Sequence, residues 1–425
     1  MKFGGTSMGD LERIRRAARI VAAEAAAGKQ VAVVVSAMAG KTNELVAWTD
    51  GAGRPSPKLA GPGIALSDDE YDIVVASGEQ VTAGLLALTL RNMGLNARSW
   101  MGWQIPILTD DAHGRARIED VPGEVLGAAM DKGEIAVVPG FQGVSRSGRI
   151  TTLGRGGSDT SAVAVAAALE CPCDIYTDVD GVYTTDPRIE SKARRLEKIS
   201  YEEMLEMASL GARVLQTRSV ELAMAKRVPL RVLSSFIEPD APLPGQEWGV
   251  LPAKSGTLIC DEEEIVEKRI VSGVTMSRDE ARITLLGLSD RVEAPADVFT
   301  RLAEANVNVD MIVQSQARSE GAVNLTFTTG RRDAARAAEL MRAAQAQLGF
   351  EELRVDEDVA KVSVVGVGMR SHAGVAQTMF RALADKGVKF QAISTSEIKI
   401  SVLIDAAYAE LAVRALHAAY GLEDV

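Results

Sequence analysis

The feature that most restricts the fold is an alternation, through the N-terminal half of the chain, of short apolar runs with segments of helical periodicity. The apolar runs at 31–35, 135–138, 174–177 and 230–234 are typical of buried strands, whereas 11–27, 74–91, 201–214 and 220–225 have the pattern of helices. Helices that alternate with buried strands pack on both faces of a mostly parallel sheet. The sequence therefore predicts a three-layer α/β domain, in which ligands bind at the carboxyl ends of the strands.

The C-terminal part contains an internal repeat. Residues 282–288 (RITLLGL) resemble residues 361–367 (KVSVVGV), and a helix follows each segment, with Phe299 and Phe380 at matching places. Two more strands and a closing helix complete each copy, at 307–313, 322–328 and 332–348 in the first and at 388–394, 398–404 and 406–420 in the second. The pattern of each copy is βαββα. Two copies predict a pair of α+β sandwiches, since a solenoid needs three or more repeats.

Two segments rich in glycine, proline and alanine interrupt these patterns. Residues 50–67 are typical of a surface loop, and residues 238–256 lie where the alternation of strands and helices ends. We therefore assign residues 1–237 to the α/β domain, 238–265 to a linker, and 266–348 and 349–425 to the two repeat units.

The composition argues against several classes of protein. A net charge of −11 argues against nucleic acid or an anionic membrane as the main partner, and no apolar run approaches the length of a membrane span. The three cysteines are too few for a disulfide framework, and the chain starts without a signal peptide, so we expect a cytoplasmic protein. The three histidines are scattered through the sequence, so no metal site is predicted.

Residues 151–161 (TTLGRGGSDTS) form a glycine-rich turn that opens a helix. Glycines allow the backbone to approach a ligand closely, and the start of a helix favours an anion. Arg155 adds a planar cation suited to a carboxylate or phosphate, and Asp159 adds a carboxylate in the first helical turn. The alternative is a structural turn in which Ser158 is the N-cap.

Residues 2–7 (KFGGTS) combine a lysine with a Gly-Gly turn and two hydroxyls, a set that suits a phosphate chain. Neither the P-loop pattern nor the glycine pattern of dinucleotide-binding folds is present. The alternative is a turn after the first strand with a lysine on the surface.

Polar side chains also follow the second strand and start the next long helix. Ser36 comes directly after the strand at 31–35, and residues 40–43, which include Thr42, lead into a helix. These hydroxyls either contact a substrate or only cap the helix. Glu79 lies at the start of an apolar helix, where a carboxylate either complements the helix dipole or binds a substrate ammonium.

Residues 174–188 (DIYTDVDGVYTTDPR) gather aspartates, tyrosines and an arginine after a predicted strand. The spacing does not match a calcium-binding loop. We interpret the segment as one lip of a nucleotide site, in which Tyr183 stacks on the base and Arg188 reaches a phosphate. Thr177 and Asp178 would bond to the base. An acidic surface loop is the alternative.

Together these segments resemble the aspartate kinase family of the amino acid kinase superfamily. The matching motifs lie in order along nearly the whole chain, at 2–7, 35–38, 77–79, 154–159, 176–187, 369–372 and 393–397. The resemblance implies transfer of the γ-phosphoryl group of ATP to the β-carboxylate of L-aspartate, the first step toward lysine, threonine, methionine and diaminopimelate. Mg²⁺ is expected to arrive with ATP, because the sequence contains no dedicated protein cage for it.

The resemblance also assigns roles to residues. It implies that Lys2 steadies the transferred phosphoryl group and that Asp159 organises this lysine. Arg155 is expected to bind the α-carboxylate of aspartate, and Glu79 its amino group. The other substrate contacts are expected from Ser36, Thr42, Gly156, Gly157 and Ser158, and the nucleotide site from Lys2, Phe3, Gly4, Gly5, Thr177, Asp178, Tyr183, Arg188 and Arg213. Phosphoryl transfer to a carboxylate needs mainly positioning and positive charge. It needs little acid–base catalysis, because the carboxylate nucleophile is already ionised near neutral pH.

The repeat units resemble ACT domains, which in this family sense amino acids. The resemblance implies one effector site at Ser289, Asp290, Asn308, Asp310 and Gln314, and a second at Met369, Ser371, His372, Ser394, Thr395 and Glu397. Lysine and threonine are the expected effectors, and the expected assembly is a homo-oligomer or a complex with a separate regulatory subunit. The alternative functions are a related kinase acting on glutamate, acetylglutamate, carbamate or UMP, and a non-catalytic amino-acid sensor.

Overall fold

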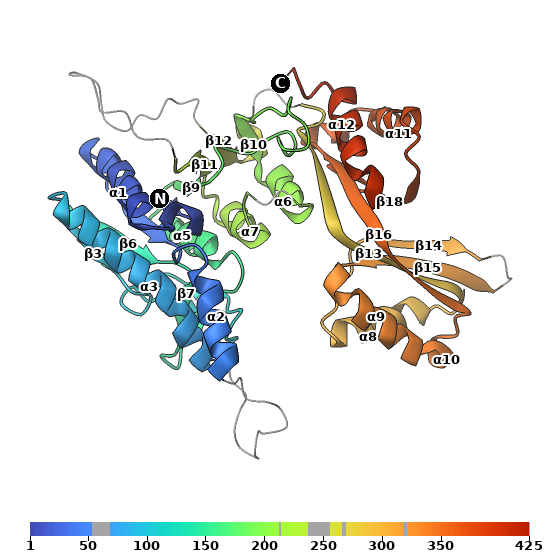
Figure 1. Cartoon of the computed structure of the whole chain (residues 1–425), viewed down its shortest axis with the longest axis horizontal. Helices are drawn as coiled ribbons and strands as arrows, with labels where there is room; N and C mark the ends of the chain where they lie inside the picture. Colours follow the sequence, from blue (N-terminus) through green and yellow to red (C-terminus); the bar gives the residue numbers. More distant parts are fainter. Residues whose placement is uncertain (53–68, 212–213, 237–255, 266–268, 318–320, 425) are drawn as a thin grey trace, which may run out of the picture. The chain divides into compact units, whose positions relative to one another are not determined.

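The computed structural model of the chain describes residues 1–52, 69–211, 214–236, 256–265, 269–317 and 321–424. These residues form two compact units (Figure 1). The first unit contains Met1–Val182, Arg195–Ala208 and the described residues between 214 and 265. The second contains Tyr183–Arg194, residues 209–211 and the described residues from 269 to 424.

An eight-stranded sheet forms the centre of the first unit. In spatial order its strands are β10 (Lys198–Ser200), β12 (Thr257–Cys260), β11 (Leu230–Ser234), β9 (Cys173–Thr177), β1 (Lys2–Phe3), β2 (Ala32–Val35), β6 (Ile135–Pro139) and β3 (Ala97–Ser99). Neighbouring strands are parallel, except that β11 and β12 are antiparallel. The prediction of a mostly parallel α/β sheet is therefore confirmed, and all four predicted strands take part in it.

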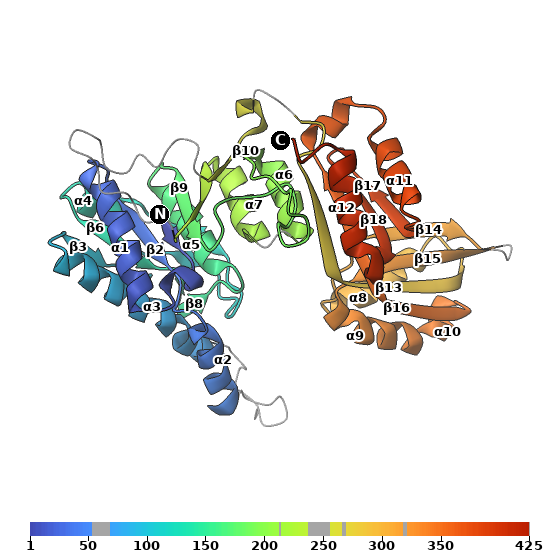
Figure 2. The ribbon, with the colours of Figure 1, turned by 45° about the horizontal axis from the view of Figure 1, so that its top comes forward.

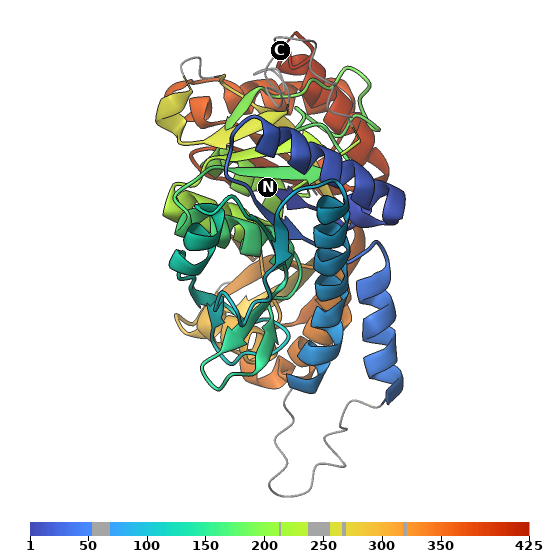
Figure 3. The same cartoon turned by 90° about the vertical axis from the view of Figure 1, so that its left-hand side faces the viewer.

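Helices cover both faces of this sheet. α1 (Leu11–Ala26) and α3 (Asp69–Asn92) pack against each other and against the side of β2 that carries Val33 (Figure 3). Val34 is also buried, and because side chains alternate between the faces of a strand, the opposite face is covered too. α5 (Gly157–Ala168) packs against β1, β2 and β9. The other helices of the unit are α2 (Lys41–Ala52), α4 (Glu124–Met130), α6 (Tyr201–Ser209), α7 (Thr217–Lys226), and the 3-10 helices η1 (Gly5–Met8) and η2 (Glu262–Glu264).

Among the described residues, α3 alone has the length and apolar composition of a membrane span, and half of its apolar window is buried within the protein. The buried side includes Leu86 and Leu90, which pack in the same core as Phe3. A core helix of a folded domain meets the same criteria of length and composition. The packing of α3 therefore explains its apolar residues without a membrane.

A second, four-stranded sheet of the first unit is not predicted from the sequence. Its strands, in spatial order, are β5 (Ile118–Asp120), β4 (Leu108–Thr109), β7 (Gln142–Ser145) and β8 (Ile150–Thr152). These strands are short and rich in polar or small residues, so they lack the apolar run that identifies a buried strand. One of them, β8, leads into the glycine-rich turn.

The linker predicted over residues 238–265 needs a correction. β12 lies in this range and pairs with β10 and β11, so its apolar run completes the sheet of the first unit. Residues 238–255 lie outside the described residues, as does most of the loop predicted over 50–67. The first residues of that predicted loop extend α2 to Ala52.

A six-stranded antiparallel sheet forms the second unit. In spatial order its strands are β14 (Ile312–Gln316), β15 (Ala322–Thr329), β13 (Gly273–Ser289), β16 (Glu352–Val365), β18 (Lys399–Asp405) and β17 (Phe390–Thr395). Its helices are α8 (Ala294–Glu304), α9 (Arg331–Ala343), α10 (Gln345–Leu348), α11 (Val375–Asp385), α12 (Ala409–Ala419), and the 3-10 helices η3 (Val367–Ser371) and η4 (Ala406–Tyr408). This element order confirms the two predicted βαββα copies.

The two copies share their central strands, β13 and β16 (Figure 2). In β13, Ile283 packs in the core formed with α8 and α9, whereas Val274 packs in the core formed with α11 and α12. β16 is divided in the same way, since Leu353 contacts the first core and Val362 belongs to the second. Residues 273–277 thus pack with the second copy, which the predicted boundary between 348 and 349 separates from them.

A segment from the predicted nucleotide lip packs with the second unit. Tyr183–Arg194 belongs to this unit, where the Thr184 carbonyl accepts a hydrogen bond from Val274 N at 2.7 Å. Thr184 Oγ1 also lies 2.9 Å from Nε2 of the buried His417 on α12. The sequence gives no sign of this packing, because the segment is contiguous with strands of the first unit.

Candidate active site

A pocket of about 310 Å³ lies where β1, β2 and β6 end and α5 begins. This is the position at which open α/β sheets bind ligands. Every residue predicted to contact the substrate or to act in catalysis lines this pocket, although their roles remain predictions. The lining consists of Lys2, Gly5, Ser36, Ala37, Met38, Ala39, Gly40, Thr42, Glu79, Phe141, Gly154, Arg155, Gly156, Gly157, Ser158 and Asp159.

Lys2 and Asp159 form a buried ion pair in the pocket lining, with Lys2 Nζ 2.6 Å from Asp159 Oδ1. Lys2 is in β1, and Asp159 is in the first turn of α5, where the helix dipole favours a carboxylate. An ammonium carries three N–H donors, and Asp159 is the only partner of Lys2 among the described residues. The pair therefore fixes a positive charge in the pocket and leaves donors for an anionic ligand.

Glu79 presents a buried carboxylate that is only half satisfied. Its side chain is 3% exposed, and Oε1 accepts a hydrogen bond from Ala37 N at 3.0 Å. Oε2 has no hydrogen-bond partner within the described part of the chain. Burial raises the pKa of Glu79 from 4.5 to about 7, since a charged group is costly away from water. A cationic group in the pocket would supply the missing partner.

The close approach of α3 to the end of β2 explains how Glu79 reaches the pocket. A Cβ on Gly78 would lie 2.9 Å from Ala37 Cβ, which is shorter than such contacts allow. The glycine before Glu79 therefore lets the helix touch the loop after β2.

The glycine-rich turn presents Arg155 to the pocket. Gly154 and Gly156 both have φ of +75°, a conformation that favours glycine, and Arg155 lies exposed between them. Arg155 has no ion pair or hydrogen bond with any residue that the structure describes, so its guanidinium is available to a ligand. The N-cap of α5 is Gly156, which differs from the alternative in which Ser158 caps the helix. Ser158 instead lies in the first turn and lines the pocket.

Gly140→Ala is expected to lower kcat/KM for the acceptor substrate about tenfold, because a new Cβ would displace the start of α5. The added Cβ would lie 2.9 Å from Ser158 Cα, and this backbone atom cannot move without shifting the pocket. Steady-state kinetics checks the prediction. Gly127→Ala in α4 is the matched control, since a Cβ there has nothing within 4 Å. Equal activity of both variants would contradict the prediction.

The predicted nucleotide residues fall into three groups. Gly4 and Gly5 follow β1, while Thr177 ends the neighbouring β9 and Asp178 follows it, so all four lie at one edge of the first sheet. Tyr183 and Arg188 belong to the second unit, where Arg188 Nη2 pairs with Asp186 Oδ2 at 2.6 Å. Arg213 lies outside the described residues.

Phe3 needs a correction as a nucleotide residue. Its side chain is fully buried in the core of the first unit. Its ring stacks on Tyr176 with the centroids 4.8 Å apart. Burial in the core leaves only the backbone of Phe3 for contact with a ligand.

The residues of the second predicted effector site lie near one another. η3 carries Met369 and Ser371 and ends before His372, and Ser394 and Thr395 close β17. The Gly366 N–H donates to the Ile398 carbonyl at 2.9 Å, and Arg370 Nε lies 3.4 Å from Glu397 Oε2. These two contacts join η3 to the turn between β17 and β18.

The residues of the first predicted effector site are not brought together within one chain. Ser289 pairs with Ala322 at one end of β15, and Asp290 follows it. Asp310 N donates to the Thr328 carbonyl near the other end of β15. At 3.3 Å per residue these ends are about 20 Å apart. Asn308 lies near the Asp310 end, Gln314 lies within the edge strand β14, and the Asp310 carboxylate pairs with Lys361.

Phe141 and Ser235 are not predicted as pocket or edge residues from the sequence. Phe141 lines the pocket with φ of +68°, a left-handed conformation that a phenylalanine rarely adopts. Ser7 Oγ donates to Ser235 Oγ at 2.7 Å beside the end of β9. The position of Ser235 directly after the parallel strand β11 could have identified it, whereas no sequence signal marks the backbone of Phe141.

Comparison with known proteins identifies the family. Residues 1–234 match the amino acid kinase family, and residues 362–420 match the ACT domain. The aspartokinase of Pseudomonas aeruginosa is 49% identical over 99% of this chain and 97% of its own length. The chain belongs to the aspartokinase family. The family resemblance drawn from the motifs is therefore confirmed.

Solved structures of the aspartokinase family share the fold. Escherichia coli aspartokinase III in complex with aspartate and ADP, in the R-state, has a TM-score of 0.75 at 29% identity, over 98% of both chains. The same enzyme in complex with lysine and aspartate, in the T-state, has a TM-score of 0.74 at 27% identity, again over 98% of both chains. The match spans both units of the chain.

Proposed function

We propose that the chain is an ATP-dependent aspartate kinase, which converts L-aspartate to 4-phospho-L-aspartate. The observation that carries the proposal is the charge pattern of the pocket, where the half-satisfied Glu79 carboxylate and the free Arg155 guanidinium accompany Lys2. An amino acid presents an ammonium and a carboxylate, and these groups complement Glu79 and Arg155. Membership in the aspartokinase family supports aspartate as that amino acid.

The residues of the pocket suffice for the chemistry of phosphoryl transfer to a carboxylate. Glu79 binds the ammonium of aspartate and Arg155 its α-carboxylate, which leaves the β-carboxylate as the nucleophile. This carboxylate is ionised near neutral pH and needs no general base. Lys2 stabilises the negative charge of the transferred phosphoryl group, and Asp159 holds the lysine in place.

The edge of the sheet beside Lys2 fits a nucleotide. A Cβ on Gly4 would lie 3.3 Å from Lys2 Nζ, and one on Gly5 would lie 3.1 Å from the Ala37 carbonyl oxygen, so larger side chains would fill the space beside the ammonium. Gly4 and Gly5 would therefore border the phosphates of ATP, with Thr177 and Asp178 nearby. The ADP bound to Escherichia coli aspartokinase III supports this assignment. Tyr183, Arg188 and Arg213 remain predicted contacts.

Mg²⁺ is proposed to accompany ATP and, when bound, to neutralise charge on the phosphates. Within the described ranges there is no group of three or more histidine, cysteine, aspartate or glutamate side chains that could hold a metal ion. Asp159 and Asp178 are carboxylates of the first unit close to the proposed nucleotide residues, since Asp159 pairs with Lys2 and Asp178 adjoins Thr177. A metal that arrives with the nucleotide needs few protein ligands.

The test of the function is the release of ADP with each candidate acceptor, together with trapping of the acyl phosphate by hydroxylamine. We expect a hydroxamate with L-aspartate and none with glutamate, acetylglutamate, carbamate or UMP. Turnover with one of these other acceptors and not with aspartate would contradict the proposal. Binding of aspartate without any ADP release would instead support a non-catalytic sensor.

The repeat units are proposed to bind amino-acid effectors, with lysine and threonine as the candidates. Lysine bound to the T-state of Escherichia coli aspartokinase III supports lysine. We expect one or both amino acids to lower the initial rate, because an inhibitor must bind an inactive conformer more tightly than the active one. Initial rates with each amino acid and with the mixture check this. Unchanged rates in all three cases would contradict it.

The oligomeric state of the functional protein is also a proposal. We propose a homo-oligomer, or a complex with a separate regulatory subunit, as the functional form. The mass of the purified complex distinguishes these two forms, since only the second contains a shorter chain.

A further inference from the structure

Asp72 on α3 carries a fully buried carboxylate that does not line the pocket. Both carboxylate oxygens are satisfied. Gly114 N donates to them at 3.0 and 3.1 Å, and Thr152 Oγ1 donates at 2.5 Å. His113 Nδ1–H donates to Oδ2 at 2.8 Å. Burying a carboxylate costs free energy unless the carboxylate is fully paired. This network therefore fixes the relative positions of α3, β8 and the loop at 113–114.

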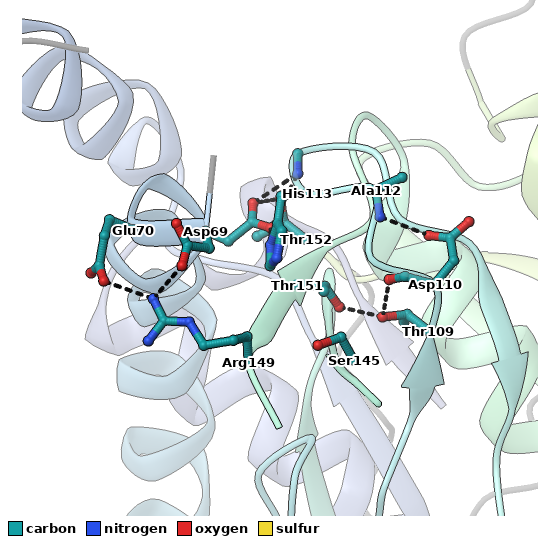
Figure 4. A network of polar contacts seen from close by, with 12 residues as sticks. Asp69, Glu70, Thr109, Asp110, Ala112, His113, Ser145, Arg149, Thr151 and Thr152 are labelled. Atoms are coloured by element: carbon teal, nitrogen blue, oxygen red, sulfur yellow. Dashed lines mark hydrogen bonds and ion pairs between the residues drawn. The ribbon is translucent and has the colours of Figure 1, made fainter. Parts of the chain in front are cut away.

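One of these elements leads into the glycine-rich turn of the pocket, and another packs against it. Thr152 is the last residue of β8, and Arg155 follows three residues later. The loop that contains His113 lies against the same turn, since a Cβ on Gly154 would be 3.2 Å from the Gly114 carbonyl oxygen. Figure 4 shows His113 and Thr152 side by side, with Thr151 facing Thr109 in the small sheet. Asp72 thus ties the start of the Arg155 turn to α3.

A second tie comes from α7. Arg218 Nη1 donates to the Leu153 carbonyl, and Arg218 Nη2 donates to the Ala116 carbonyl, each at 2.6 Å. Ala116 N in turn donates to the Thr152 carbonyl at 2.9 Å. The turn is therefore held on both sides. Asp72, together with Arg149, which pairs with Asp69 and Glu70 just before β8, connects it to the helix that carries Glu79.

Asp72 and Glu79 lie on one side of α3, because seven residues make nearly two helical turns. The helix between them is continuous and rises about 10 Å. Glu79 is the proposed partner of the substrate ammonium, and the turn held by Asp72 carries the proposed partner of the α-carboxylate. The spacing of these two groups therefore depends on the Asp72 network.

We propose that Asp72 is a positioning residue for the amino-acid acceptor, which sets the distance between Glu79 and the Arg155 turn through Thr152 and Gly114. This inference rests on the proposed function, because it assigns the two partners of an amino acid to Glu79 and Arg155. Loosening the network impairs acceptor binding and leaves nucleotide binding intact, since Lys2, Gly4 and Gly5 do not contact it.

The test is Thr152→Val, which removes the hydroxyl donor and keeps the shape of the side chain. We expect the KM for aspartate to rise about tenfold, while the KM for ATP stays within about twofold. Thr152→Ser keeps the donor and should restore the KM for aspartate. Asp72→Asn is a second variant, expected to act in the same direction as Thr152→Val.

Thr151→Val is the matched control for loss of stability. Thr151 is the neighbouring residue of β8, is equally buried, and shares a hydroxyl hydrogen bond of 2.6 Å with Thr109 Oγ1. It has no contact with Asp72 among the described residues. We expect Thr151→Val to lower thermal stability about as much as Thr152→Val and to leave both KM values unchanged. Equal KM values for the two variants would overturn the proposal.

Calorimetric titration of aspartate without ATP separates this inference from the proposed function. If the wild type neither binds nor phosphorylates aspartate, the proposed function fails. The network is then judged by amide hydrogen exchange, which should increase at residues 153–157 in Thr152→Val and not in Thr151→Val. If the wild type binds aspartate and Thr152→Val binds it with the same Kd, the positioning role is refuted.

Discussion

Lys2→Met is expected to lower kcat by about 10³-fold, because the pocket loses the positive charge that stabilises the transferred phosphoryl group. The loss should fall on kcat more than on the KM for aspartate, since Lys2 is proposed to act on the transition state and Glu79 and Arg155 to bind the acceptor. Coupled measurement of ADP release at saturating aspartate and ATP checks this. A kcat within tenfold of the wild type would contradict the role of Lys2.

A loss of folding has to be separated from a loss of catalysis, because Lys2→Met leaves Asp159 buried without its partner. The double variant Lys2→Met with Asp159→Asn removes both charges, so we expect it to regain stability and remain inactive. Lys2→Arg keeps the charge but should stay slow, since a Cβ on Gly4 would already lie 3.3 Å from Lys2 Nζ and little room is left. Lys29→Met, which breaks the ion pair with Glu24 elsewhere in the first unit, is expected to leave kcat unchanged.

Glu79→Gln is expected to raise the KM for aspartate about 100-fold, because the substrate ammonium loses a buried, charged acceptor. The pH dependence provides an independent readout. Since burial raises the pKa of Glu79 to about 7, kcat/KM for aspartate in the wild type should fall as the pH drops below that value. The variant has no carboxylate to protonate, so this dependence should disappear. A variant that keeps the wild-type pH profile would show that another group controls binding.

Stability measurements show whether Glu79→Gln acts through folding. The folded-state pKa of about 7 lies above the ordinary value of 4.5, so ionisation of Glu79 destabilises the folded protein. This cost is fully present above pH 7 and is lost as the pH falls toward 4.5. Glu79→Gln should therefore be more stable than the wild type at about pH 8, and the difference should shrink at about pH 5.5. Glu24→Gln alters another buried glutamate and should leave the KM unchanged.

The central sheet and the repeat could be predicted because their signals are local. The run at 31–35 is apolar throughout, as a strand buried on both faces requires, and β2 forms there. The strands of the small sheet are short and mostly polar, and tertiary pairing rather than composition defines them. The sequence pattern places the apolar run that forms β12 in a linker, because its pairing with β10 and β11 depends on tertiary contacts.

The candidate pocket could be predicted because parallel strands end at one edge of a sheet, so polar residues that follow several strands converge. Ser36 lines it for this reason, whereas Lys2 lies within β1 itself and Arg155 follows β8 of the small sheet. Asp72 could not be predicted, since an aspartate near the start of a helix is usually a simple partner of the helix dipole. The packing of Tyr183 with the second unit depends on contacts remote in sequence. A cytoplasmic location stays a prediction from composition.

The shared strands β13 and β16 limit where the chain can be divided. A fragment that begins at residue 349 would lack residues 273–277, which pair with Lys361–Val365 and place Val274 in the core of α11 and α12. Such a fragment would expose one side of β16 and should aggregate, whereas a fragment that begins near residue 269 retains both copies. The two ACT-type copies therefore form one folding unit and cannot be separated by cutting the chain between them. The sequence repeat alone would suggest two independent domains.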